Sequence, residues 1–263
     1  MLISNFLNSR KSIRDYKKKK IKDKDLKEIQ KVLDSKNLGS TDYQFTVHGD
    51  GDKIYDALDG HGGYGGVMIK APEYIAMNVL SEDPMAHLKA AYVMEEIDGE
   101  LQDLGMGTCW VTLLEASDQI IKDCFGNEKG HIKYLLAFGY PARTFNFGTS
   151  EFVPKMGVEE YVFKNLDRDT YTMEELDNMG LADIFYYLRM APSSKDKQPQ
   201  RFVVDGNVIK LYAKDLESAD DFMDMGIALY YFDELAKASS IKTDWEFDVK
   251  EEGDLTYIGK TSF

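Results

Sequence analysis

The chain has 263 residues, enough for one large domain or two small ones with a substantial core. Hydrophobic residues make up 43% and charged residues 30%, but acids outnumber bases 46 to 32 and give a formal net charge of −14. This balance argues against a dedicated nucleic-acid binder or a protein of anionic membranes, and two cysteines are too few for a disulfide framework. With a polar N-terminus and no apolar run of about 18 residues, we expect a soluble cytoplasmic protein.

The first half of the chain alternates between helical and extended patterns. Leu26, Ile29 and Leu33 recur at helical spacing and predict a first helix. The elements expected after it, in chain order, are an extended piece over 45–47, a helical stretch over 53–58, a glycine-rich turn over 60–66, a buried strand over 74–80, a long helix over 84–104 and a buried strand over 132–138. Residues 143–168 have a mixed character and are interpreted as a connection.

The second half repeats this mixture of helices and strands. A helix is expected from near Thr172 to Leu188, and a final helix over 222–236. Between them, Asp205-Gly206 separates two strand-like runs and is the strongest hairpin signal in the chain. The pattern predicts an α+β fold with two lobes, 1–165 and 166–263.

Most motifs of enzyme chemistry are absent or out of place. Residues 60–65 match GxGxxG, but a helical stretch precedes them and a strand follows, the reverse of a dinucleotide site. The four histidines are scattered, and the chain has no CxxC, HExxH, GxSxG or P-loop motif. The run Lys17–Lys20 is interpreted as a solvated strand or loop. We therefore predict no metal site and no catalytic side chain, and expect a borrowed cofactor.

Three segments carry residues suited to such a cofactor. Arg10, Ser12 and Arg14 alternate on an extended segment, so their side chains would share one side and could bind a phosphate. Gly105–Trp110 permits an unusual backbone path whose following N–H groups could meet a ligand edge, and the loop Ala191–Phe202 offers hydroxyls and amides. Each of the three segments also has an interpretation that involves no ligand: the first is a basic terminus, the second is a helix end leading into a strand, and the third is a polar surface loop.

Together these segments resemble the flavin-dependent nitroreductase family. Ser9–Arg14 is similar to its phosphate-binding Arg/Lys-Ser-x-Arg signature, and Gly105–Trp110 to its Gly-Leu-Gly-Thr-Cys-Trp segment. Phe138–Ala142 resembles the end of its Gly-Tyr-Pro-Ala strand, and Ala191–Phe202 its Ala-Pro-Ser-x-x-Asn-x-Gln-Pro-Trp-Arg-Phe loop. The resemblance spans nearly the whole sequence and is specific as a set.

The order of the motifs is unusual for that family. In its ordinary homodimeric members the Ala-Pro-Ser loop precedes the Gly-Thr-Cys-Trp segment, whereas here it follows in the second lobe. This order resembles the branch in which two half-units are fused in one chain, so the resemblance implies a nitroreductase-like pseudo-dimer. The second lobe lacks its own Arg-x-Ser-x-Arg, so we expect one flavin per chain and a monomer.

Residue by residue, the resemblance implies a shared FMN site. The residues expected to contact FMN are Arg10, Lys11, Ser12 and Arg14 at the phosphate, main-chain groups of Val111, Thr112 and Leu113 near N5 and O4, Arg143 or Lys155 as a further phosphate contact, and Pro192, Ser193, Ser194, Asp196 and Gln198 from the second lobe. Two positions depart from the family: Asp196 stands where Asn is usual, and Gln200 where Trp is usual. These departures put a contact to the pyrimidine edge in question.

The resemblance also implies an activity. It predicts ping-pong hydride transfer, in which NADH or NADPH reduces FMN and a small-molecule oxidant such as a nitroaromatic or quinone then takes the electrons. Two alternatives stay open: a flavin-binding or regulatory module with little turnover, and another flavin reaction on the same fold, such as reductive dehalogenation or flavin fragmentation.

Overall fold

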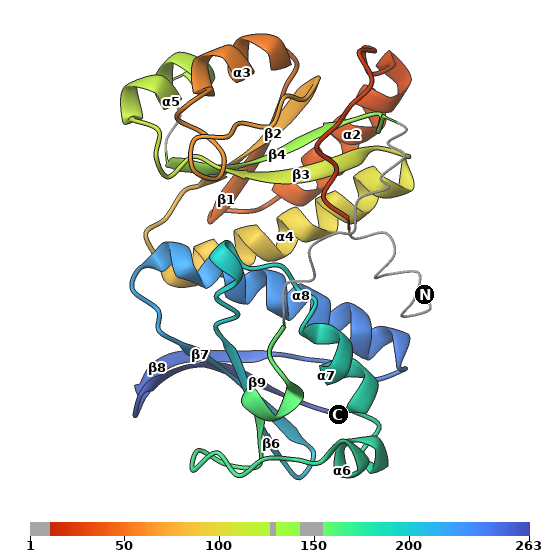
Figure 1. The fold of residues 1–263 in the computed structure, drawn as a ribbon, viewed down its shortest axis with the longest axis vertical. Coiled ribbons are helices and arrows are strands. Elements are labelled where there is room, and N and C mark those ends of the chain that lie inside the picture. Colours follow the sequence, from red (N-terminus) through yellow and green to blue (C-terminus); the bar gives the residue numbers. More distant parts are fainter. Residues whose placement is uncertain (1–10, 127–129, 143–154) are drawn as a thin grey trace. The chain divides into compact units, whose positions relative to one another are not determined.

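The computed structural model describes residues 11–126, 130–142 and 155–263. Within these residues the chain forms two compact units, one ending by residue 142 and the other beginning by residue 155, each with its own β-sheet (Figure 1). Residues 155–165, which the sequence analysis groups with the first lobe, belong to the second unit, because β5 (Val162–Phe163) pairs with a strand of the second sheet. Each unit is described by itself.

The first unit contains a four-stranded antiparallel sheet. Its strands are β1 (Tyr43–His48), β2 (Glu73–Val79), β3 (Gly107–Thr112) and β4 (His131–Gly139), in the spatial order β1-β2-β4-β3. The long strands β2 and β4 therefore lie at the centre, and β3 is an edge strand whose outer side carries backbone groups that β4 does not pair. This edge position decides what β3 can bind.

Four helices cover the two faces of this sheet. They are α2 (Asp23–Asn37), α3 (Gly51–Leu58), α4 (Pro84–Asp103) and α5 (Asp118–Phe125). Figure 1 shows α3 and α5 on one side of the sheet and α2 and α4 on the other. Local sequence fixes where two of them begin: the Asp83 carboxylate accepts the Met85 N–H ahead of Pro84, and the Ser117 hydroxyl accepts the Ile120 N–H.

The core of the first unit lies on both faces of β2. Every residue of β2 is buried, because alternate side chains point to opposite faces and helices cover both. On the α3 and α5 side, Tyr74 and Ala76 pack with Leu58, Val111 and Leu135 in one apolar cluster. The sheet is thus held rigidly behind the β3 edge.

The second unit contains a five-stranded sheet with the order β5-β6-β7-β9-β8. Its other strands are β6 (Gln200–Asp205), β7 (Val208–Lys214), β8 (Glu246–Glu252) and β9 (Leu255–Ser262); β5 runs parallel to β6 and the remaining pairs are antiparallel. Three helices accompany it: α6 (Met173–Asn178), α7 (Ala182–Leu188) and α8 (Phe222–Ala238).

Aromatic side chains form the core between this sheet and its helices. Phe185 of α7, Phe202 of β6 and Phe232 of α8 are fully buried, and their ring centroids lie 5.3–5.9 Å apart. Tyr161 joins them with rings in edge-to-face contact, and its hydroxyl donates to the Phe185 carbonyl oxygen. This aromatic cluster packs α8 against β6, the strand that follows the loop after α7.

The structure confirms most of the expected elements and corrects some. The hairpin at Asp205-Gly206 and the final helix are present, the helix reaching Ala238. The single helix expected from Thr172 to Leu188 is wrong: Gly180, with φ of +73°, separates α6 from α7. Helix α5 and strands β8 and β9 are not among the elements the sequence pattern predicts.

Candidate functional site

The N-terminal segment that carries Ser12 and Arg14 lies along the beginning of β3. Ser12 forms a parallel bridge with Thr108, and the Ile13 N–H donates to the Thr108 carbonyl oxygen at 2.7 Å. Further along, the Ala142 N–H donates to the Asp15 carbonyl oxygen at 2.9 Å. The segment therefore runs as an added extended strand beside the sheet, fixed at β3 and after β4.

Two glycines allow this close approach. A Cβ on Gly107 would lie 2.8–2.9 Å from three side-chain carbons of Ile13, and a Cβ on Gly139 would lie 2.7 Å from Pro72 and 3.1 Å from the Tyr16 ring. Since real Cβ contacts do not come nearer than about 3.0 Å, Gly107 is required for the segment to pack at Ile13, whereas Gly139 is required by Pro72 and leaves only a tight fit for Tyr16. The glycine of the Gly-Thr-Cys-Trp segment thus serves the docking of the N-terminal segment.

Tyr16 holds the other end of the same segment, a role that the sequence analysis missed. Its hydroxyl donates to the carbonyl oxygens of Ile13, at 2.6 Å, and Ala137, at 3.1 Å. Burial raises the pKa of this phenol well above its usual range, so it stays a neutral donor. A tyrosine two residues after the Arg-x-Ser-x-Arg pattern was the available signal.

Ser12 and Arg14 both act on the thiol of Cys109 on β3. Burial raises the pKa of Cys109, while the positive charge of Arg14 and a hydrogen bond from Ser12 lower it. Ser12 therefore lies within hydrogen-bonding reach of Cys109, and Arg14 is near enough for its charge to act on the thiol. Lys11, directly before Ser12, is exposed, and the described part of the segment offers a hydroxyl and a guanidinium together.

The hydrogen-bonding pattern of β3 determines which of its main-chain N–H groups point away from β4. The Leu113 N–H donates to the Lys133 carbonyl oxygen at 2.7 Å, so it is already used inside the sheet. Alternation along an antiparallel strand puts Val111 on the same inner side and turns Trp110 and Thr112 outward. Of Val111, Thr112 and Leu113, only Thr112 therefore presents its N–H on the free edge.

The glycine-rich turn closes the far end of this edge. The Gly63 N–H donates to the Thr112 carbonyl oxygen at 2.8 Å, and the turn closes on itself through the Gly60 N–H and the Gly66 carbonyl oxygen at 3.1 Å. Tyr64 and Val67 at its tip are 66% and 68% exposed. As the sequence predicts, this GxGxxG match is a turn after a helix, not a dinucleotide motif.

The expected second-lobe residues form a tight loop between α7 and β6. The Gln198 N–H donates to the Ser193 hydroxyl at 3.0 Å, and the Ser194 N–H donates to both carboxylate oxygens of Asp224 on α8, at 2.9 and 3.1 Å. Pro192 is exposed beside them. Asp224 is a partner of this loop that the sequence analysis did not identify.

Two contacts inside the second unit limit what this loop can offer a ligand. Lys155 forms an ion pair with Asp196, so the carboxylate that stands in the place of the family's Asn is matched by a cation. The Gln198 Oε1 accepts the Met156 N–H at 3.2 Å, which leaves its amide as a donor. Lys155, expected as a phosphate contact, is thus the partner of Asp196. Arg10 and Arg143 lie outside the described residues.

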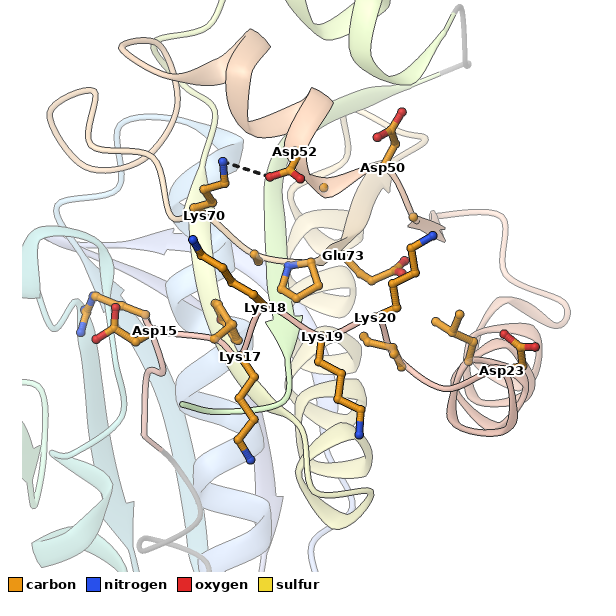
Figure 2. A pocket seen from close by; sticks show the side chains of 18 residues that line it. Asp15, Lys17, Lys18, Lys19, Lys20, Asp23, Asp50, Asp52, Lys70 and Glu73 are labelled. Atoms are coloured by element: carbon orange, nitrogen blue, oxygen red, sulfur yellow. Dashed lines mark ion pairs between the residues drawn. The ribbon is translucent and has the colours of Figure 1, made fainter. Parts of the chain in front are cut away.

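A pocket of about 1080 Å³ adjoins Arg14 in the first unit (Figure 2). Its charged lining comprises Arg14, Lys17, Lys18, Lys19, Lys20 and Lys70 against Asp15, Asp23, Asp50, Asp52 and Glu73. Lys70 pairs with Asp52 at 3.0 Å. Because the two signs nearly balance, this pocket does not select an anion, and the exposed run Lys17–Lys20 is a solvated segment as expected.

Across 11–126, 130–142 and 155–263, no group of three or more His, Cys, Asp and Glu side chains could hold a metal ion. In the same ranges no helix combines the length and apolar character needed to cross a bilayer.

The fold is that of nitroreductase-type oxidoreductases, as comparison with family models shows: residues 3–236 match the family described as "Putative TM nitroreductase". The match covers most of the chain, so the protein belongs to this family. The family resemblance expected from the sequence is confirmed. No curated protein matches the chain.

The chain also matches solved structures. The chain is similar to a structure from Thermotoga maritima described as a putative nitroreductase, with a TM-score of 0.57, 18% identity and coverage of 100% of this chain and 94% of that one. It also matches a nitroreductase with bound FMN from Bacteroides fragilis (TM-score 0.43, 18% identity, 58% and 98% covered). A third match is described as a putative NADH oxidase from Clostridium acetobutylicum (TM-score 0.42, 23% identity, 56% and 93% covered).

Proposed function

We propose that the protein is an FMN-dependent oxidoreductase that takes hydride from NADH or NADPH and passes the electrons to a small oxidant such as a nitroaromatic or quinone. One observation carries the proposal: the free edge of β3 has a hydroxyl and a guanidinium at one end and an outward Thr112 N–H at the other. Membership of a nitroreductase family supports it, as do relatives described as an FMN complex and a putative NADH oxidase.

The donor set of this edge fits FMN chemically. A phosphate monoester needs charge-assisted donors in fixed geometry, and Arg14 with Ser12 supplies them on a segment fixed by the Ile13 hydrogen bond. A flavin edge carries acceptor atoms at N5 and O4, and the Thr112 N–H is a main-chain donor outside the sheet ladder. Arg10, Lys11 and Arg143 are proposed as further contacts to the phosphate.

The loop of the second unit is proposed to bind the same FMN. Motif order along the chain supports this, because the first lobe has no Ala-Pro-Ser loop of its own and Pro192–Gln198 in the second lobe supplies one. The fixed conformation of the loop, with Ser193 and Gln198 hydrogen-bonded to each other, also supports a binding role. In this arrangement Asp196 enters the site as an ion pair with Lys155.

The protein's part in the reaction is to bind and orient. FMN, when bound, supplies the two-electron redox chemistry. Ser12 and Arg14 hold the phosphate, and the Thr112 N–H favours negative charge that develops near it. Cys109 stays a neutral thiol, because burial raises its pKa. No side chain is proposed as a general acid or base.

Steady-state kinetics test the proposal. Purified full-length protein reconstituted with FMN should oxidise NADH or NADPH, and an added nitroaromatic or quinone should increase the rate several-fold. A protein that binds FMN tightly but shows no acceptor-dependent turnover would instead be a flavin-binding module. A protein that binds no FMN would contradict the proposal outright. The variant Lys18→Ala loses one positive charge in the solvated segment and should keep the wild-type rates, so it controls for a general effect of lost charge.

A further inference from the structure

The loop Ser193–Gln198 has a strained backbone. Lys195, Asp196 and Gln198 have φ values of 52°, 54° and 46°, in the left-handed region that residues other than glycine rarely adopt. Such a conformation persists only where neighbouring contacts impose it, and strain of this kind concentrates at ligand-binding loops. Three left-handed residues within four positions therefore require specific contacts that hold the loop.

One buried carboxylate supplies the strongest of these contacts. Asp224 lies on the third position of α8 and is 7% exposed. Both of its oxygens accept the Ser194 N–H, at 2.9 and 3.1 Å, at the point where the loop enters its left-handed stretch. Directly before α8, the N-cap residue Asp221 pairs with Lys197 of the loop at 3.2 Å. The loop is thus held at two places, by the first turn of α8 and by the residue that precedes it.

The electrostatic setting of Asp224 is unfavourable to its charge. Burial raises the pKa of Asp224 to about 6; the hydrogen bond from Ser194 and the charge of Lys197 lower it, and the charge of Asp221 raises it. Asp221, directly before α8, and Lys197 of the loop are the charged groups that act on it. A carboxylate kept where burial penalises it indicates a role other than stability.

We propose that Asp224 is a positioning residue whose carboxylate fixes the Ser193–Gln198 loop in the conformation that binds FMN. The inference rests on the proposed function, because only then is this loop part of the FMN site. Asp224 acts through Ser194 and is not itself assigned a contact with ligand. Its neutral replacement should leave the fold intact but loosen the loop.

Amide hydrogen exchange in the full chain without FMN tests the first half of the inference. In Asp224→Asn and Asp224→Ala at pH 8, the Ser194 amide should exchange about tenfold faster than in wild type, because its charged acceptor is lost. Glu234→Gln is the control: Glu234 is an acid of the same helix, lies ten residues beyond Asp224 and pairs with Lys237. Its Ser194 amide should exchange as in wild type.

FMN affinity as a function of pH tests the second half. The phosphate of FMN itself titrates near pH 6, so the informative quantity is the ratio of wild-type to Asp224→Asn affinity, in which that titration cancels. This ratio should be on the order of tenfold at pH 8 and should fall toward one by pH 5 as Asp224 becomes protonated. A purely structural defect would lower affinity equally at all pH values.

The outcomes separate the inference from the proposed function. Unchanged Ser194 exchange in both variants overturns the inference. Faster exchange with an affinity ratio near one at every pH also overturns it, because the loop would then be held for some other purpose. If wild type binds no FMN, the proposed function fails and the inference fails with it, while the exchange result still shows whether Asp224 holds the loop.

Discussion

The contact between Gly107 and Ile13 can be tested by adding one methyl group. In Gly107→Ala, the new Cβ would lie 2.8–2.9 Å from the Cβ, Cγ1 and Cγ2 atoms of Ile13. The backbone of Gly107 is not left-handed, so the substitution acts through this collision and not through strain. Overpacking of this kind costs about 1–3 kcal/mol. We expect Ile13 to move and its hydrogen bond to Thr108 to break.

The consequence should appear in FMN binding more than in global stability. Ser12 and Arg14 flank Ile13, so displacing it moves both of the residues proposed to bind the phosphate. If the whole overpacking energy opposes the bound arrangement, FMN affinity should fall about 5- to 150-fold. Fluorescence titration of FMN into apoprotein measures this. The global unfolding free energy should change less, because Ile13 is only half-buried.

Two further variants make the test sharp. Ile13→Ala in the Gly107→Ala background removes two of the three colliding atoms and should restore part of the affinity. Gly105→Ala is the matched control: its Cβ meets nothing within 4 Å, although its φ of +80° gives strain of roughly 1–2 kcal/mol, so stability should fall without loss of FMN. Wild-type affinity in Gly107→Ala would refute the assignment of the phosphate to this segment.

Three other predictions follow from the site and the chain. Arg14→Ala should weaken FMN binding about tenfold or more through loss of a charge-assisted contact, measured by the same titration, with unchanged affinity in both Arg14→Ala and Arg10→Ala moving the phosphate elsewhere. Light scattering coupled to flavin absorbance should find a monomer with one FMN, because both halves of the proposed site are in one chain; a stable dimer or two flavins per chain would contradict this. Finally, because the pKa of Asp224 is raised to about 6, its contribution to stability is present below pH about 4 and is lost as pH rises through about 6. Chemical denaturation should therefore show wild type losing about 3 kcal/mol relative to Asp224→Asn between pH 4 and pH 8. A pH-independent difference between the two proteins would disprove the raised pKa.

Local signals predicted the elements whose cause is local. The hairpin between β6 and β7 follows from Asp205-Gly206, where Gly206 has the positive φ that a tight turn requires. The beginning of α6 was readable from Thr172 and Glu175, which form a reciprocal capping box, but the pattern of apolar residues across Gly180 suggested one helix instead of two. The positive φ of Gly180 ends α6, although the apolar periodicity alone predicts that the helix continues.

The sequence pattern does not predict elements that depend on contacts between distant parts of the chain. Strand β8 has almost no buried side chain, so it shows no alternation, and it is a strand because β9 offers it an edge to pair with. The same holds in the site. That Thr112 and not Leu113 presents its N–H outward depends on the register of β3 against β4, which a list of motif residues does not contain. Asp224 and Ser194 are joined across 30 positions of the chain.

The loop at Ser193 brings stability and binding into opposition. Left-handed backbone at Lys195, Asp196 and Gln198 disfavours the folded state by roughly 1–2 kcal/mol per residue, and the buried charge of Asp224 disfavours it further at neutral pH. Raising the pH through about 6 ionises Asp224, which lowers the stability of the chain and strengthens the hold on Ser194. A feature selected for stability alone would move both quantities in the same direction. Here the expected signs differ, in agreement with our proposal that the loop is held in a conformation that binds a ligand.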